Sequence, residues 1–156
     1  MLELLSRLPD GVLFHGEGKV TPIPINDEIA SLSAILLDDD YYQLVHEGTV
    51  LIDNLPIVKA THLIPLKVQA WSDLSFRKEK GEAVDSKDIS KHKNDVFRLY
   101  QLLTIDDEVL LPEKSKKVMK EFLEKVQYTD INFKQLSLHN MTKDEVFSNL
   151  RKIYIL

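Results

Sequence analysis

The sequence predicts an α+β protein in which a small N-terminal mixed sheet, residues 1–60, precedes a C-terminal helical bundle, residues 61–156. The two parts are expected to pack together as one domain. Three observations predict this fold class. Two β-branched runs flank an Asp53-Asn54 pair, which is typical of a hairpin. In the second part, apolar residues recur with the helical period of about 3.6. A capping box that begins at Thr142 marks the start of a late helix.

The N-terminal part is expected to contain strands, a loop and one short helix. Residues 2–7 are apolar-rich and end at a Pro-Asp-Gly turn, as a buried strand would. Residues 11–28 hold glycines and prolines without helical period and are expected to be loop, whereas residues 31–37 fit a strand better than a short helix. The aspartates at 38–40 predict an N-cap and an acidic first turn of a helix that stops before Gly48.

Four helices are expected in the bundle. The first begins at Thr61 and tolerates Pro65 because it lies in the first turn. Asp85 or Ser86 caps the second, which is expected to pack antiparallel to the first. Pro112 occupies the first turn of the third. In each helix a stripe of apolar residues is expected to face the core. From the first helix to the fourth, these residues are Leu63, Leu66, Ala70 and Leu74; Ile89, Val96, Leu99 and Leu103; Val118, Met119, Phe122, Leu123 and Val126; and Val146, Phe147, Leu150 and Ile153.

Composition limits the classes of function. The 156 residues are 44% hydrophobic and 29% charged, with a net charge of −5, so only the lysine-rich segment 77–93 is a sizeable basic candidate for nucleic acid. The chain has no cysteine, which excludes disulfides and thiolate zinc sites and fits a cytoplasmic location. No apolar run approaches the roughly 20 residues that span a bilayer, so no membrane partner is expected.

The second helix of the bundle carries the strongest candidate for a site. Its apolar stripe is interrupted at His92 and Lys93, and charged residues at spacings of three or four share one face. One interpretation is a solvated face, in which Asp95 pairs with Lys91 or Arg98. The other is a phosphate-binding face, because cationic donors on a rigid helix neutralise a polyphosphate without reorganising. The residues of this face are Lys87, Lys91, Asp95 and Arg98.

Three other positions have two interpretations each. Lys67 lies on an otherwise apolar side of the first bundle helix, where it either snorkels to solvent or makes a second phosphate contact. Glu3 alternates with leucines on the first strand and therefore faces opposite to them, where it is either an exposed surface glutamate or projects into a cleft. The carboxylates at 38–40 could suit magnesium, but successive side chains diverge and the helix dipole already accounts for them.

Two motifs carry a resemblance to a known family. They are Leu66-Lys67-x-x-Ala70 and the run from Lys93 to Leu99, Lys-Asn-Asp-Val-Phe-Arg-Leu. With LELLSRLPD, TPIPI and SLSAILLDDDYY upstream, residues 2–104 resemble bacterial nucleotidyltransferase-like proteins related to the toxins of abortive-infection systems. The resemblance implies that the sheet is a remnant of a nucleotidyltransferase fold and that the bundle closes a nucleotide cleft.

The resemblance also implies roles for single residues. Lys67 would contact phosphate, and Lys87, Lys91 and Lys93 would add further phosphate contacts. Asp95 would orient neighbouring groups or the nucleotide as a catalytic residue. Glu3 is similar in position to the third sheet carboxylate, which would make it both catalytic and a metal ligand. If the chain is active, Mg²⁺ and a nucleoside triphosphate are the implied cofactors; otherwise there is none.

The sequence departs from the family pattern in one decisive respect. The Gly-Ser turn and the Asp-x-Asp pair would lie upstream of Met1, and Asp38 and Asp40 have that spacing in the wrong order. Asn94 is inserted in the second motif, and Arg98 stands where many relatives have an aspartate. The chain is therefore expected to be N-terminally truncated and inactive alone, retaining phosphate binding; whether it is an enzyme stays open.

The alternative is a non-enzymatic binding module for a protein or nucleic-acid partner. A bare sheet predicts self-association or a complementing chain, because unpaired strand edges invite further strands. The family resemblance adds an antitoxin as a candidate partner, and nucleic acid stays open.

Overall fold

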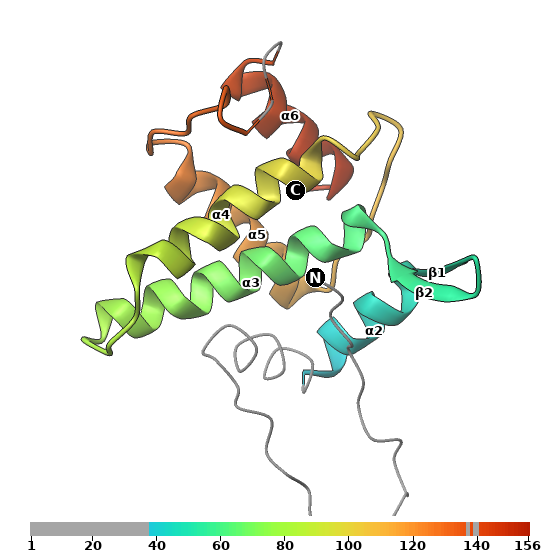
Figure 1. Cartoon of the computed structure of the whole chain (residues 1–156), viewed down its shortest axis with the longest axis horizontal. Helices are drawn as coiled ribbons and strands as arrows, with labels where there is room; N and C mark the ends of the chain where they lie inside the picture. Colours follow the sequence, from blue (N-terminus) through green and yellow to red (C-terminus); the bar gives the residue numbers. More distant parts are fainter. Residues whose placement is uncertain (1–37, 137, 139–140) are drawn as a thin grey trace, which may run out of the picture.

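The structure is a computed structural model that describes residues 38–136, 138 and 141–156. In these residues the chain forms five helices and one two-stranded antiparallel sheet, so the fold is α+β with a helical majority (Figure 1). The predicted strands at 2–7 and 31–37 lie outside the described residues. The elements in order are α2 (Asp39–Gly48), β1 (Thr49–Ile52), β2 (Leu55–Val58), α3 (Ala60–Glu79), α4 (Ser86–Tyr100), α5 (Glu113–Val126) and α6 (Lys143–Ile153).

The start of α2 confirms the N-cap predicted from the aspartate run. The Asp38 carboxylate accepts a hydrogen bond from the backbone N–H of Asp40 at 3.1 Å. It also accepts one from the Lys114 ammonium of α5, which holds the pKa of Asp38 below its usual value. The helix includes Gly48, where a Cβ would lie 2.3 Å from the Cβ of His62. Glycine is therefore required by the close approach of α2 to α3.

Replacing Asp38 with alanine is expected to lower the free energy of unfolding by about 1 kcal/mol at neutral pH, because it removes the cap of α2. The folded-state pKa is depressed, so this stabilisation is present above the unfolded pKa, near 3.8, and is lost as pH falls through the lower folded value. Urea unfolding of both proteins from pH 7 to pH 3 measures the difference. Asp40→Ala is the control; an equal loss there would contradict the capping role.

The hairpin predicted around Asp53 and Asn54 is confirmed. Strands β1 and β2 pair antiparallel with Ile52 opposite Leu55, and the two turn residues have φ of 51° and 62°. Two successive left-handed residues are typical of the tight hairpin turn, which asparagine and aspartate tolerate better than other non-glycine residues. The hairpin projects from the helices (Figure 1) and exposes Leu51 and Ile52, by 73% and 52%.

Helices α3 and α4 form the antiparallel pair that the sequence predicted (Figure 1). Helix α5 packs on α3, and Phe147 of α6 contacts Phe97 of α4. Asp85 caps α4 by accepting from the backbone N–H of Lys87 at 2.9 Å. Thr142 and Glu145 form the predicted capping box of α6. The shared core contains an aromatic cluster of Trp71, Phe97, Phe122, Phe133 and Phe147.

Two proline positions differ from the sequence expectation. Pro112 is the N-cap of α5 rather than a residue of its first turn. Pro65 is not in the first turn of α3, because that helix begins at Ala60, and its missing N–H removes the i→i−4 donor for the carbonyl of Thr61. The hydroxyl of Tyr154 donates to that carbonyl at 2.7 Å. A tertiary hydrogen bond therefore replaces the one that proline cannot make.

Candidate functional site

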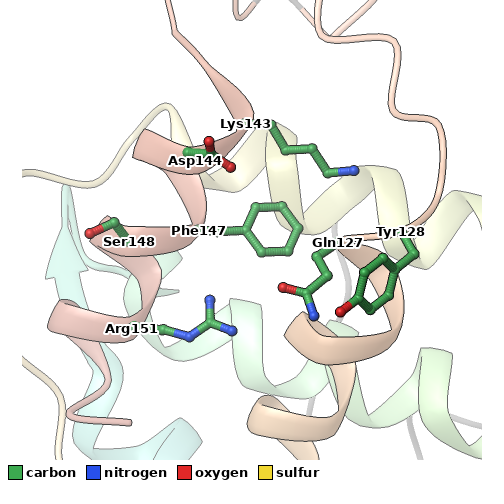
Figure 2. Close-up of a pocket in the computed structure, with 7 residues that line it drawn as sticks. All are labelled: Gln127, Tyr128, Lys143, Asp144, Phe147, Ser148 and Arg151. Carbon is green, nitrogen blue, oxygen red and sulfur yellow. The ribbon is translucent and has the colours of Figure 1, made fainter.

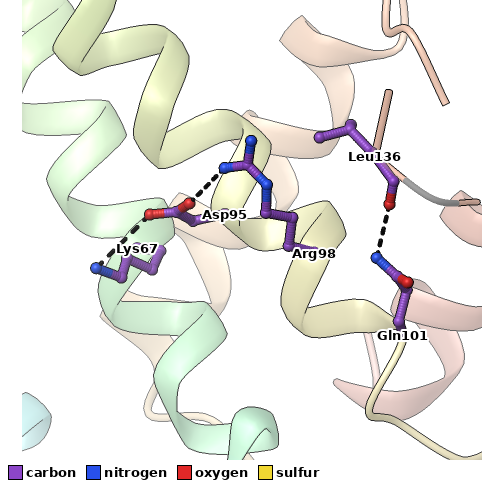
Figure 3. Close-up of polar contacts among 5 residues, drawn as sticks. All are labelled: Lys67, Asp95, Arg98, Gln101 and Leu136. Atoms are coloured by element: carbon purple, nitrogen blue, oxygen red, sulfur yellow. Dashed lines mark hydrogen bonds and ion pairs between the residues drawn. The ribbon is translucent and has the colours of Figure 1, made fainter. Parts of the chain in front are cut away.

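The two residues that carry the family motifs meet across the α3–α4 interface. The Lys67 ammonium of α3 lies 3.8 Å from the Asp95 carboxylate of α4. On the other side of this carboxylate, the Arg98 guanidinium donates a hydrogen bond at 3.0 Å (Figure 3). One carboxylate therefore lies between two cations, and the cluster has an excess of one positive charge.

Local sequence explains why these side chains lie at the edge of the interface. Leu66 and Val68 are buried on either side of Lys67, and Val96 is buried beside Asp95. The charged side chains occupy the border of the apolar seam, where the Lys67 side chain is 13% and the Asp95 side chain 20% exposed. Partial burial weakens solvent screening, so charges at this border act more strongly on a ligand than fully exposed ones.

The geometry leaves the Lys67 ammonium available for a further partner. A separation of 3.8 Å is too long for a hydrogen bond, so the contact with Asp95 is an ion pair without one. An ammonium has three N–H donors. Among the described residues, no hydrogen bond uses those of Lys67. The carboxylate thus holds the lysine in place while its donors remain open to an anion.

The remaining predicted amines are divided between different sides of α4. Lys87 and Lys91 are exposed and lie about two turns and one turn before Asp95, respectively. Lys93 is two residues from Asp95, about 200° around the helix. It lines a separate hollow of about 240 Å³ facing segment 130–136, to which Lys67, Lys87 and Lys91 do not contribute. Glu3 lies outside the described residues, so its proposed place in the site stays a prediction.

A hydrogen bond joins the C-terminal end of α4 to the segment before α6, whose Leu136 lines the hollow beside Lys93. The amide of Gln101 donates to the backbone carbonyl of Leu136 at 2.7 Å (Figure 3). Asn94 and Arg98 also line this hollow. Arg98 therefore touches both the ion-pair cluster and the hollow.

His92 accounts for the polar interruption in the apolar stripe of α4. Its side chain is fully buried in the seam of α4, between the core positions Val96 and Ile89. Lys93 takes the more exposed place beside it. The polar interruption is thus a buried histidine, and the cationic face is formed by other residues.

The sequence interpretation missed a second cationic hollow at the far end of the bundle. It lies between the C-terminal end of α5 and α6, and its lining includes Tyr128, Lys143, Phe147 and Arg151. A signal was present, because Lys143, Phe147 and Arg151 follow one another at the i,i+4 spacing that places residues on one helix face. From the sequence, only the capping box and the apolar stripe of this helix are singled out.

Comparison with protein-family models, with curated proteins and with solved structures finds no match to this chain. Within the part of the chain that the structure describes, none of the helices has both the length and the apolar character needed to cross a bilayer. In the same part, no group of three or more histidine and acidic side chains comes together to hold a metal ion.

Proposed function

We propose that this chain is a nucleotidyltransferase-like protein whose α3–α4 pair binds the phosphates of a nucleotide. The observation that carries the proposal is the meeting of Lys67 and Asp95 across the helix interface, 3.8 Å apart. The two residues come from the two motifs on which the resemblance rests. Their proximity is what a shared site requires.

In this proposal each residue of the cluster has a distinct role. Lys67 donates hydrogen bonds to phosphate oxygens, and such charge-assisted bonds are stronger than neutral ones. Asp95 is a positioning residue, since it holds the ammonium beside the interface rather than touching the ligand. Arg98, whose side chain is 54% exposed, balances the Asp95 charge, so that the cluster still attracts an anion. Lys87 and Lys91 extend the positive face along α4.

The proposed activity of the described residues is phosphate binding rather than nucleotidyl transfer. Metal-assisted transfer needs carboxylates that hold magnesium. Asp38, the first of the aspartate run, serves instead as the cap of α2 and as the partner of Lys114. Asp38 is therefore not assigned to a magnesium site in this proposal, and Glu3 is the remaining candidate ligand. A cytoplasmic location belongs to the same proposal.

The test is a titration of the full chain with ATP and magnesium, followed by calorimetry and by amide chemical shifts. Wild type is expected to bind, and Lys67→Ala to weaken binding by about tenfold or more, the loss of one charge-assisted bond. Lys120→Ala, an exposed lysine of α5, is the charge-matched control and should bind as wild type does. Asp95→Asn should bind ATP with an affinity between those of wild type and Lys67→Ala.

Two outcomes would refute the proposal. One is the absence of any binding by wild type at millimolar ATP. The other is equal binding by wild type and Lys67→Ala, with circular dichroism showing both folded. Asp95 retains Arg98 as a partner in the Lys67 variant, so that variant is expected to fold.

A second candidate function is that of a protein-binding module, and the hairpin favours it. Leu51, Ile52, Leu55 and Ile57 are all exposed on β1 and β2, by 43% or more. Among the described residues these strands pair only with each other, and exposed apolar strands of this kind suit the addition of a strand from a partner or from a second copy. A chain with this function alone would bind no nucleotide in the titration above.

A further inference from the structure

The hollow at the end of the bundle has the chemistry of a ligand site. Its volume is about 470 Å³, and it lies between the residues that follow α5 and one face of α6 (Figure 2). The Phe147 ring and the Arg151 guanidinium project into the same space, while Tyr128 stands on the opposite side. None of its lining residues belongs to the α3–α4 cluster, so the hollow is independent of the function proposed above.

The hollow is positive although the chain is negative. Lys143 and Arg151 outnumber the single lining carboxylate, Asp144, whereas the whole chain has a net charge of −5. Arg151 is half-buried, and among the described residues its guanidinium has no hydrogen-bond or ion-pair partner. A partly desolvated cation without a counter-charge is unfavourable, and a bound anion would compensate it.

Lys143 is held in place at the rim. Its ammonium donates to the backbone carbonyl of Thr129 at 2.8 Å and lies 5.9 Å from the centroid of the Phe147 ring. The two contacts fix one cation without neutralising it, because a carbonyl and an aromatic face carry no net charge. A second cation is thus preorganised beside Arg151.

An exposed aromatic ring completes the arrangement. Tyr128 is 87% exposed, more than any other large apolar or aromatic side chain among the described residues. An aromatic ring beside cationic groups is the combination by which proteins bind nucleotides, since every base has a face that stacks and every phosphate has oxygens that accept. A plain anion would need the cations but not the ring.

We propose that this hollow binds a nucleotide, with the base stacked on Tyr128 and the phosphate on Arg151 beside Lys143. The nucleotide can be free or can belong to a single strand of nucleic acid, since both present the same base and phosphate.

The probes are adenosine monophosphate, inorganic phosphate and a single-stranded octa-adenylate, each titrated into the full ¹⁵N-labelled chain. Adenosine monophosphate is expected to shift the amides of Gln127, Tyr128, Ser148 and Arg151. Arg151→Ala should weaken binding by about tenfold or more, the loss of a charge-assisted contact. Tyr128→Ala should weaken the binding of adenosine monophosphate about fivefold or more, because stacking is lost. The same variant should bind inorganic phosphate as wild type does.

Lys152→Ala is the matched control, because Lys152 is the exposed neighbour of Arg151 and does not line the hollow. It should bind within twofold of wild type, and Lys67→Ala should keep this site intact, which separates it from the α3–α4 cluster. Tighter, salt-sensitive binding of the octamer would identify a nucleic-acid strand as the ligand, whereas equal or tighter binding of the monophosphate would identify the free nucleotide. Two results would overturn the proposal. One is that neither adenosine monophosphate nor the octamer shifts any amide at millimolar concentration. The other is that Lys152→Ala weakens binding as much as Arg151→Ala does.

Discussion

Replacing Phe97 with alanine is expected to lower the free energy of unfolding by about 3–5 kcal/mol, the range for removing a buried aromatic ring. Phe97 is completely buried and its ring lies 6.3 Å from Phe122, 5.8 Å from Phe133 and 6.0 Å from Phe147, measured between centroids. It therefore joins α4 to α5, to α6 and to the segment between them. Its removal leaves a cavity that three elements would have to fill together.

Denaturation by urea, followed by circular dichroism and by the fluorescence of Trp71, measures the Phe97 effect. Phe76→Ala is the matched control, because that ring is 57% exposed near the end of α3. This substitution should lower the free energy of unfolding by less than about 1 kcal/mol, because the Phe76 ring buries little apolar surface. Similar losses in the two variants would contradict the assignment of Phe97 to the centre of the core.

The second large effect is expected from Tyr154→Phe, at about 1–3 kcal/mol, the cost of leaving a buried polar group without its partner. The hydroxyl of Tyr154 is buried, burial raises its pKa, and it donates to the carbonyl of Thr61. That carbonyl lacks its helical donor because Pro65 has no N–H. Removing the hydroxyl therefore leaves the acceptor unsatisfied inside the protein.

A double-mutant cycle isolates this cause. In Pro65→Ala, residue 65 regains an N–H that can bond the Thr61 carbonyl, so Tyr154→Phe should cost at least about 1 kcal/mol less there than in wild type. The effect of proline on the unfolded chain cancels in the cycle, since both arms contain it. Additive losses would show that the contribution of the Tyr154 hydroxyl does not depend on the missing N–H of Pro65.

The proposed phosphate site illustrates how far single residues could be predicted. Lys67 and Asp95 were each singled out from their motifs, and Arg98 was placed on a common face with Asp95 by helical spacing. The ion pair between Lys67 and Asp95 was not predicted, because no rule of spacing connects residues on two different helices. It depends on the rotation and the register of α3 against α4, which core packing sets.

The sequence by itself determined the features whose partners are close along the chain. The Asp38 and Asp85 caps, the turn at Asp53 and the capping box at Thr142 each involve residues no more than three positions apart, so local chemistry suffices. Only the tertiary structure decided the contacts between distant segments. Tyr154 and Thr61 are 93 residues apart, and Tyr128 and Arg151, which line the same hollow, come from different parts of the chain. Such contacts follow from how buried surfaces pack, which no short stretch of sequence encodes.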